Sequence, residues 1–282
     1  MQAEFVTPED SRSRLWVPVS GGRLYVEVLG DGPPLVMVHG WPLDHRIFNA
    51  QVAGLRNDMT LLRYDRRGFG KSDAPPDLVQ EVDDIDIVLD TMGVESAHFL
   101  GMSQGGRIAL RYSVTRPERV RSLVLQGAAV DGMSAAENDA ERIPLREYAE
   151  LAQEGNLNEV RQRWLRHPLM RLEPGFANES IHVRRIVDGY FGRDLLTPGP
   201  AGFAYPIDVL SCLHDFRKPV LLITGAAESE SRKRHAAELL RRLPDCREIV
   251  LEGGGHLCNL TAAGKYNDAV RAFCLGVESA KT

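Results

Sequence analysis

The sequence lacks an excess of basic residues, because 34 Lys and Arg stand against 39 Asp and Glu, for a formal net charge of −5 at pH 7. Lys and Arg neutralise the phosphates of a bound nucleic acid, so no nucleic-acid partner is expected. No apolar run reaches the roughly 18 residues of a membrane span, and residues 1–13 lack the apolar segment of a signal peptide. The sequence therefore predicts a soluble, cytoplasmic protein with no membrane partner.

Cysteine is also scarce, and the four cysteines form no C-x-x-C pair. They are Cys212, Cys246, Cys258 and Cys274. This spacing favours neither a disulfide framework nor a zinc site, and it indicates thiols kept in a reducing compartment. No H-E-x-x-H, EF-hand or Walker motif occurs. We therefore expect no metal and no cofactor.

Short apolar runs recur along the chain without the alternation of a half-exposed strand. Such runs are typical of strands buried on both faces, as in a parallel sheet covered by helices. Segments with helical periodicity lie between them, at residues 78–92, 231–243 and 266–274. This alternation predicts an α/β fold with one doubly wound, mostly parallel sheet. The expected strands are residues 35–38, 61–62, 98–100, 123–125, 220–223 and 249–251, after a hairpin at residues 14–19 and 23–28.

One long segment, residues 131–215, interrupts this rhythm with helical stretches and frequent prolines. We expect residues 1–130 and 216–282 to form one core domain, with residues 131–215 inserted as a helical cap over the carboxyl edge of the sheet. Open α/β sheets bind ligands at that edge. The alternative is a packing appendage without a ligand role. Large apolar residues of the segment would line a pocket or fill the cap's own core: Met133, Trp164, Leu169, Met170, Tyr190 and Phe191.

The most specific motif is Gly-Met-Ser-Gln-Gly at residues 101–105, directly after the strand at 98–100 and before a helical segment. It matches G-x-S-x-G in the strand–turn–helix context of a nucleophile elbow. The glycines let neighbouring backbone approach a serine on a tight turn, and the helix N-terminus directs N–H groups toward a developing oxyanion. Ser103 is therefore the candidate nucleophile.

A serine nucleophile needs a base, and His256 is the candidate. It follows three glycines after the strand at 249–251, so its loop can carry the imidazole back over Ser103. His235, by contrast, lies on a charged helix and is expected at the surface. A third residue should accept the imidazole N–H of the base and hold its tautomer.

Three carboxylates are candidates for this third residue. Glu228 lies three residues after Gly225, at the carboxyl edge of the sheet, and is the favoured one. Asp131 follows the strand at 123–125 and offers a second route to the site. Glu230 is the third candidate, unless it is a solvated loop charge. Asp131 and Glu230 thus stay open as alternatives to Glu228.

The segment His-Gly-Trp-Pro at residues 39–42 follows the strand at 35–38. Gly40 permits a sharp turn that places the backbone N–H of Trp41 next to that of Gln104. These two donors form the expected oxyanion hole. His39 is expected to be a core histidine that bonds local backbone and transfers no proton.

A polar, glycine-bearing loop at residues 64–73 follows another expected strand. It does not match the G-x-G-x-x-G pattern of dinucleotide binding. Asp65, Arg67 and Ser72 are instead expected to fix the loop by hydrogen bonds.

With these residues in place, the chain resembles the α/β-hydrolase superfamily over nearly its whole length outside residues 131–215. The resemblance rests on residues 39–42, 65–72, 101–105, 225–228 and 255–256. Residues 39–44 resemble the cofactor-free haloperoxidase and perhydrolase esterases, and residues 255–260 resemble the 3-oxoadipate enol-lactonases and related esterases. The order of Ser103, Glu228 and His256 is the order that this fold uses.

Two departures refine the resemblance. Relatives of this type usually carry Asp at the position of Glu228. Haloalkane dehalogenases and many epoxide hydrolases carry an Asp nucleophile where this chain has Ser103, which argues against dehalogenation and epoxide opening.

Residues and resemblance together predict a serine hydrolase that cleaves a carboxylic ester or lactone through an acyl-enzyme on Ser103. C–C hydrolysis of a vinylogous diketone, thioesterase chemistry and perhydrolase chemistry use the same triad and stay open. A receptor that binds its ligand with little turnover is the alternative of another class. The expected partner is a small ester or lactone, and the expected assembly is a monomer or homodimer.

Overall fold

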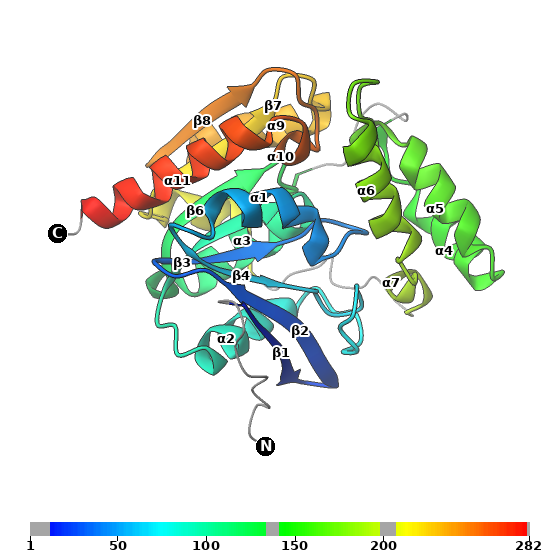
Figure 1. Cartoon of the computed structure of the whole chain (residues 1–282), viewed down its shortest axis with the longest axis horizontal. Coiled ribbons are helices and arrows are strands. Elements are labelled where there is room, and N and C mark those ends of the chain that lie inside the picture. Colours follow the sequence, from blue (N-terminus) through cyan, green and yellow to red (C-terminus); the bar gives the residue numbers. More distant parts are fainter. Residues whose placement is uncertain (1–11, 134–140, 198–206, 281–282) are drawn as a thin grey trace.

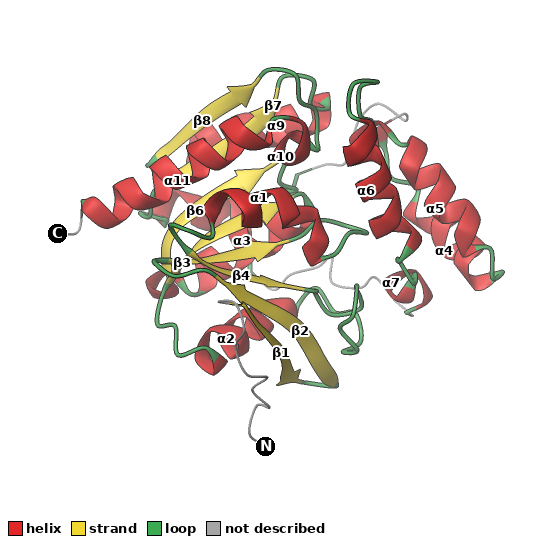
Figure 2. Ribbon diagram, in the orientation of Figure 1, coloured by secondary structure: helices red, strands yellow, loops and turns green. Residues whose placement is uncertain are grey.

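The computed structural model describes residues 12–133, 141–197 and 207–280. In these ranges eight strands form one sheet in the order β1-β2-β4-β3-β5-β6-β7-β8 (Figures 1 and 2). The β1–β2 and β2–β4 pairs are antiparallel and the others are parallel, which confirms the predicted mostly parallel sheet. The strands are β1 (Arg12–Val19), β2 (Gly22–Leu29), β3 (Pro34–Val38), β4 (Thr60–Tyr64), β5 (Ala97–Met102), β6 (Val120–Gln126), β7 (Val220–Gly225) and β8 (Cys246–Leu251).

Helices cover both faces of the sheet, as the lack of alternation in the strands predicted. One face carries α1 (Asn49–Leu55), α10 (Cys258–Thr261) and α11 (Ala263–Ser279), and the other carries α2 (Glu81–Thr91), α3 (Gln104–Thr115) and α9 (Glu230–Arg242). Short 3-10 turns, η1 (His45–Phe48) and η2 (Pro117–Arg119), precede α1 and β6. In β3, Leu35 and Met37 enter the first core, whereas Val36 and Val38 enter the second. Successive side chains of a strand point to opposite faces, so an unbroken apolar run fills both cores.

Between β6 and β7 the described chain is helical. Its elements are α4 (Leu145–Gln153), α5 (Leu157–Arg166), η4 (Pro168–Met170), α6 (Ala177–Asp188), α7 (Arg193–Leu196), α8 (Val209–Cys212) and η5 (Leu213–Asp215). Helices α4 to α7 gather on one side of the sheet, at the right in Figure 1. Near the end of this segment, Val209 and Leu213 are buried in the same core as α2, α3 and α9. Residues 134–140 and 198–206 of this segment lie outside the described residues.

Helix α2 begins later than its periodicity predicted. The pattern predicted a helix over residues 78–92, but the helix begins at Glu81. Oδ1 of Asp77 accepts hydrogen bonds from the backbone N–H groups of Val79 and Gln80, at 2.9 and 3.1 Å. These are the hydrogen bonds of an N-cap residue, and residues 78–80 form a turn that leads directly into the helix.

The helices are short relative to a bilayer. The longest described helix, α11, has 17 residues, whereas a membrane-spanning helix needs about 20. Across the described residues, no helix combines the length and the apolar composition that a membrane crossing requires.

Candidate active site

Ser103 lies at the junction of β5 and α3 in a strained backbone conformation. Its φ of 54° makes it the one non-glycine residue with positive φ in the part of the chain that the structure describes. Such a conformation costs on the order of 1 kcal/mol or more and persists only where surrounding contacts hold it. The N–H of Ser103 donates to the carbonyl of Gln126 at 2.8 Å, and its carbonyl accepts from the N–H of Ala129 at 3.1 Å. Strand β6 and the loop after it therefore hold the serine in place.

The glycine that follows Gln104 lets α3 start against β3. A Cβ atom on Gly105 would lie 2.1 Å from the carbonyl oxygen of Val38. No side chain fits at that distance, so the second glycine of the G-x-S-x-G motif is required by the close approach of the two backbones. The first turn of α3 is thus pressed against the end of β3, where the next loop begins.

His256 and Glu228 form a buried pair on the loops after β8 and β7. Nδ1 of His256 lies 2.7 Å from Oε2 of Glu228, and both side chains are at most 4% exposed. The carbonyl oxygen of His256 accepts a hydrogen bond of 2.8 Å from Nε2 of Gln126. The same residue of β6 therefore contacts the loops of Ser103 and His256.

The carboxylate of Glu228 is stabilised in its charged form. Burial acts to raise its pKa, but the charge and hydrogen bond of His256 and the N–H of Ser229 outweigh burial, so the pKa lies below its usual value. That N–H donates to Oε1 at 2.7 Å. Each carboxylate oxygen thus has its own donor, and Glu228 orients the imidazole with Nδ1 protonated.

The two alternative carboxylates, Asp131 and Glu230, pair with other side chains than His256. Oδ2 of Asp131 accepts from Nε of Arg111 at 2.6 Å, and its Oδ1 lies 3.2 Å from Nε of Arg107. Glu230 is exposed at the start of α9, where it pairs with Lys233. Of the three candidates from the sequence, the structure brings Glu228 to His256.

Trp41 and Gln104 come from two loops that meet at Ser103. A Cβ atom on Gly40 would lie 3.1 Å from Cβ of Ser103, so the loop after β3 passes directly beside the serine. Gln104 is the first residue of α3, where backbone N–H groups have no partner within the helix. Its side-chain oxygen accepts from Arg66 at 2.8 Å. The side chain of Trp41 is held separately, because its indole N–H donates to Asp194 at 2.6 Å.

His39 is fully buried and engaged at both ring nitrogens. Nε2 accepts from the N–H of Arg66 at 3.0 Å, so Nδ1 carries the proton and donates to the carbonyl of Gly40 at 2.9 Å. Burial, assisted by the charge of Arg66, lowers the pKa of His39 to about 3. The predicted core placement of His39 is confirmed.

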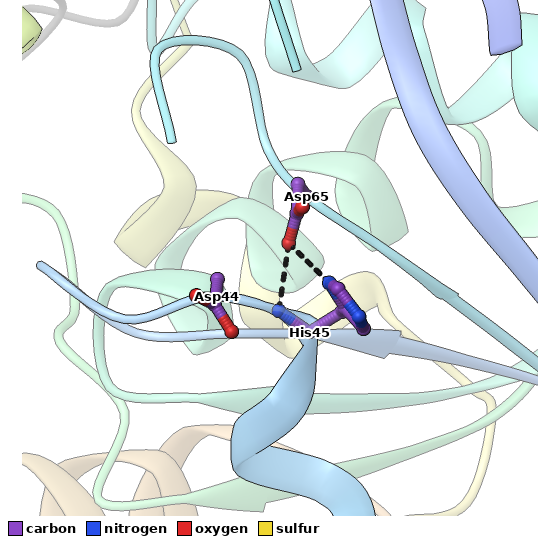
Figure 3. A group of neighbouring side chains, drawn as sticks. All are labelled: Asp44, His45 and Asp65. Atoms are coloured by element: carbon purple, nitrogen blue, oxygen red, sulfur yellow. Dashed lines mark hydrogen bonds and ion pairs between the residues drawn. The ribbon is translucent and has the colours of Figure 1, made fainter. Parts of the chain in front are cut away.

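Hydrogen bonds fix the loop at residues 64–73, as predicted. The hydroxyl of Ser72 donates to the carbonyl of Asp65 at 2.5 Å, and Arg67 donates twice to Asp84 at 2.7 Å. Oδ1 of Asp65 accepts from the N–H and Nδ1 of His45 at 2.8 and 2.6 Å (Figure 3).

Among the described residues, Asp44, His45 and Asp65 form a group whose ligand atoms could surround a metal ion, since these atoms lie within 4.8 Å of one another (Figure 3). Both oxygens of each carboxylate already accept hydrogen bonds. Arg46 donates to both oxygens of Asp44, and Oδ2 of Asp65 accepts from the N–H of Lys71 at 2.8 Å. The group therefore acts as a hydrogen-bonded support of the loop.

The prediction that His235 lies at the surface is wrong. Its side chain is 4% exposed, and Nδ1 accepts from the N–H of Val130 at 3.1 Å. The charged pattern of α9 misled the prediction, because the loop after β6 crosses this helix and covers the ring.

A pocket of about 290 Å³ lies beside Ser103, and we call it the Ser103 pocket. Trp41 and Gln104 line it from the core, and Trp164 of α5 and Leu169 of η4 line it from the inserted helices. Among the predicted apolar residues, Met133 also lines it, whereas Met170 and Tyr190 are buried in the core and Phe191 is exposed.

Sequence reasoning missed the charged part of this lining: Arg107, Arg142, Arg232 and Glu141. A signal was present, because Arg107 and Arg232 each lie four residues after a site candidate, Ser103 and Glu228. Ser103 and Glu228 each lie just before the N-terminus of a helix. The residue four positions later therefore falls in the first turn of that helix. Each arginine is thus carried to the carboxyl edge of the sheet.

The sequence profile of the family described as alpha/beta hydrolase fold matches residues 33–263. The chain is 23% identical over 273 residues to 3-oxoadipate enol-lactonase 1 of Acinetobacter baylyi, which covers 92% of this chain and 95% of that protein. An esterase from Rhodococcus sp. ECU1013 has a similar structure, with a TM-score of 0.79 at 23% identity over 95% of this chain and 99% of the other. The structure of the enol-lactonase from Burkholderia xenovorans LB400 is similar as well, with a TM-score of 0.76 at 22% identity over 92% of this chain and 98% of the other.

Proposed function

Because the chain belongs to the alpha/beta hydrolase fold family, matched over residues 33–263, we propose that it is a serine hydrolase that cleaves a carboxylic ester or lactone. Its predicted membership of this family and its class as a hydrolase are confirmed by that match and by the similarity to lactonases and esterases. The catalytic roles of single residues and the bond that is cleaved are the proposal.

One observation supports the mechanism above all others. The pair of Glu228 and His256, 2.7 Å apart and buried, lies on loops that contact the same strand as the strained Ser103. A carboxylate that orients an imidazole, together with a serine on a tight turn that lines a pocket, is the arrangement that acyl transfer requires.

In the proposed reaction, Oγ of Ser103 attacks the ester carbonyl carbon while Nε2 of His256 takes its proton. The backbone N–H groups of Trp41 and Gln104 donate to the resulting oxyanion. The C–O bond then breaks, and His256 gives its proton to the leaving alcohol. Water, deprotonated by His256, attacks the acyl-enzyme and releases the acid and the free serine.

The inserted segment, residues 131–215, acts in this proposal as a cap. Trp164 and Leu169 line the Ser103 pocket together with Trp41 of the core, and the rings of Trp41 and Trp164 meet edge to face at 4.7 Å. These aromatic and aliphatic side chains limit the access of water to this part of the pocket.

The test is hydrolysis of 4-nitrophenyl esters of increasing acyl length and of several lactones by wild type and Ser103→Ala. The variant should lose about 10⁴-fold or more in kcat, because the triad acts as a unit. Ser180→Ala is the matched control, since that serine is exposed on α6 and its hydroxyl contacts only the carbonyl of Phe176 among the described residues.

Near-wild-type turnover by Ser103→Ala would overturn the mechanism. A wild-type protein that is labelled once at Ser103 by a fluorophosphonate, but turns over no ester or lactone, would support a ligand-binding receptor instead.

A further inference from the structure

The Ser103 pocket has an excess of positive charge. Its charged lining residues are three arginines and one glutamate. The glutamate, Glu141, is already used, because its carboxylate accepts hydrogen bonds of 3.2 and 3.1 Å from the N–H groups of Glu230 and Ser231. It therefore binds the N-terminus of α9. Arg107 pairs with Asp131, which lies outside the lining, at 3.2 Å.

Arg232 is half-buried, and it differs in its contacts from three arginines that the fold buries. Arg63, Arg66 and Arg67 each donate two hydrogen bonds to one buried carboxylate: Glu27, Glu81 and Asp84, respectively. Within the described residues, the guanidinium of Arg232 makes no hydrogen bond or ion pair with a carboxylate. Glu228 and Glu141 act on it only through their charge. The donor fork of Arg232 is thus available to a ligand in the pocket.

Electrostatics also favour an anion in this pocket. Burial lowers the pKa of Arg232, although the charges of Glu228 and Glu141 oppose the shift. Burial likewise lowers the pKa of Arg107 to about 10, against the charge of Asp131, and the charges of Arg111 and Arg232 lower it further. The two cations therefore repel each other in a partly desolvated space, and a bound anion would relieve this repulsion.

We propose that the substrate carries a carboxylate remote from the bond that is cleaved, and that Arg232, with Arg107 beside it, binds this carboxylate in the Ser103 pocket. The inference rests on the proposed hydrolysis and names its substrate class: monoesters of dicarboxylic acids, in which the acyl chain ends in a free carboxylate. The planar guanidinium matches a carboxylate with two parallel hydrogen bonds. Arg232 then selects which acyl group enters, and Ser103 performs the chemistry.

The experiment compares two esters that differ in one terminal group, monomethyl adipate and methyl hexanoate, by release of methanol. The readout is the ratio of their kcat/KM values. Wild type should prefer the adipate ester, and Arg232→Gln should lower this ratio by about 10- to 100-fold, the effect of one charge-assisted hydrogen-bonded pair. Arg232→Lys, which keeps the charge but not the fork, should restore part of the preference. Arg241→Gln is the control, because Arg241 is exposed further along α9 and pairs with Glu238.

A ratio that is unchanged in Arg232→Gln, with normal thermal stability of the variant, would overturn the carboxylate site and leave ester hydrolysis standing. Calorimetric titration with adipate and with inorganic phosphate separates the two proposals. Adipate binding that requires Arg232 supports the site even if neither ester is hydrolysed. Tighter binding of phosphate than of adipate overturns the choice of a carboxylate.

Discussion

The substitution Glu228→Gln separates the roles of the three candidate carboxylates. It preserves the length of the side chain and replaces one oxygen by an amide NH₂ group. The N–H of Ser229 donates to Oε1 at 2.7 Å, so the amide oxygen of the glutamine is held at that position. The NH₂ group must then occupy the place of Oε2, 2.7 Å from Nδ1 of His256.

A donor at this position reverses the imidazole tautomer. Nδ1 becomes the acceptor and Nε2 carries the proton, so Nε2 can no longer take the proton of Ser103. In a serine protease triad, the equivalent loss lowers kcat by about 10⁴-fold. We expect a decrease of about 10³- to 10⁴-fold for Glu228→Gln, with KM changed little because Glu228 does not line the Ser103 pocket.

Glu228→Asp should be less harmful. The loop is fixed by hydrogen bonds of 2.9 Å from Ala227 to Gly254 and from Glu228 to Gly225. If the backbone stays in place, removal of one CH₂ withdraws the carboxylate by about 1.5 Å. The hydrogen bond to His256 is then lost, but the tautomer is not reversed, so kcat should fall by about 10- to 100-fold.

The assay is release of 4-nitrophenol from an ester at neutral pH, with thermal unfolding as a check of folding. Asp131→Asn should lower stability, because Arg111 and Arg107 lose a carboxylate, yet keep kcat within tenfold of wild type, and exposed Glu230→Gln should change neither. A Glu228→Gln variant within tenfold of wild type, or a larger loss in Asp131→Asn, would refute the assignment.

Two further substitutions test the supports of the site. Asp194→Asn leaves one of two donors without an acceptor, either the indole N–H of Trp41 or the hydroxyl of Tyr190. The free energy of unfolding, measured in urea, should therefore fall by about 1–3 kcal/mol. An unchanged free energy of unfolding would show that these hydrogen bonds do not stabilise the fold. Glu27 is buried, which acts to raise its pKa, but a hydrogen bond from Tyr25 and the charge of Arg63 lower the pKa from 4.5 to about 2. Because the folded pKa lies below the unfolded one, the stabilising contribution is complete above pH 4.5 and is lost as the pH falls toward about 2. The stability difference between wild type and Glu27→Gln should therefore shrink over this range in urea titrations, and a constant difference would show that the charge of Glu27 does not stabilise the fold.

The sequence was sufficient for features that follow from local order. Ser103 follows the apolar run of β5, and Glu228 and His256 follow those of β7 and β8. Parallel strands bring their carboxyl ends to one edge, so residues far apart in the chain could be assigned to one place before the structure was known. The doubly wound sheet followed from the same unbroken apolar runs.

Contacts between loops could not be predicted in this way. Trp41 and Asp194 are separated by 153 positions and His235 and Val130 by 105, and no periodicity links members of such pairs. The burial of His235 depends on the path of the loop after β6. The pairing of Trp41 depends on the position of α7, which packing of the inserted helices determines.

Gln126 limits how far the two reacting groups can drift apart. Its carbonyl oxygen accepts from the N–H of Ser103, and its amide donates to the carbonyl of His256 and to Oδ1 of Asn259. Thermal displacement of this strand residue moves both loops in the same direction. The displacements of the two loops are therefore correlated. The distance between the hydroxyl of Ser103 and the imidazole of His256 then changes less than the position of either loop. The geometry of proton transfer can stay precise even while each loop fluctuates, because one glutamine at the carboxyl end of β6 couples the two loops.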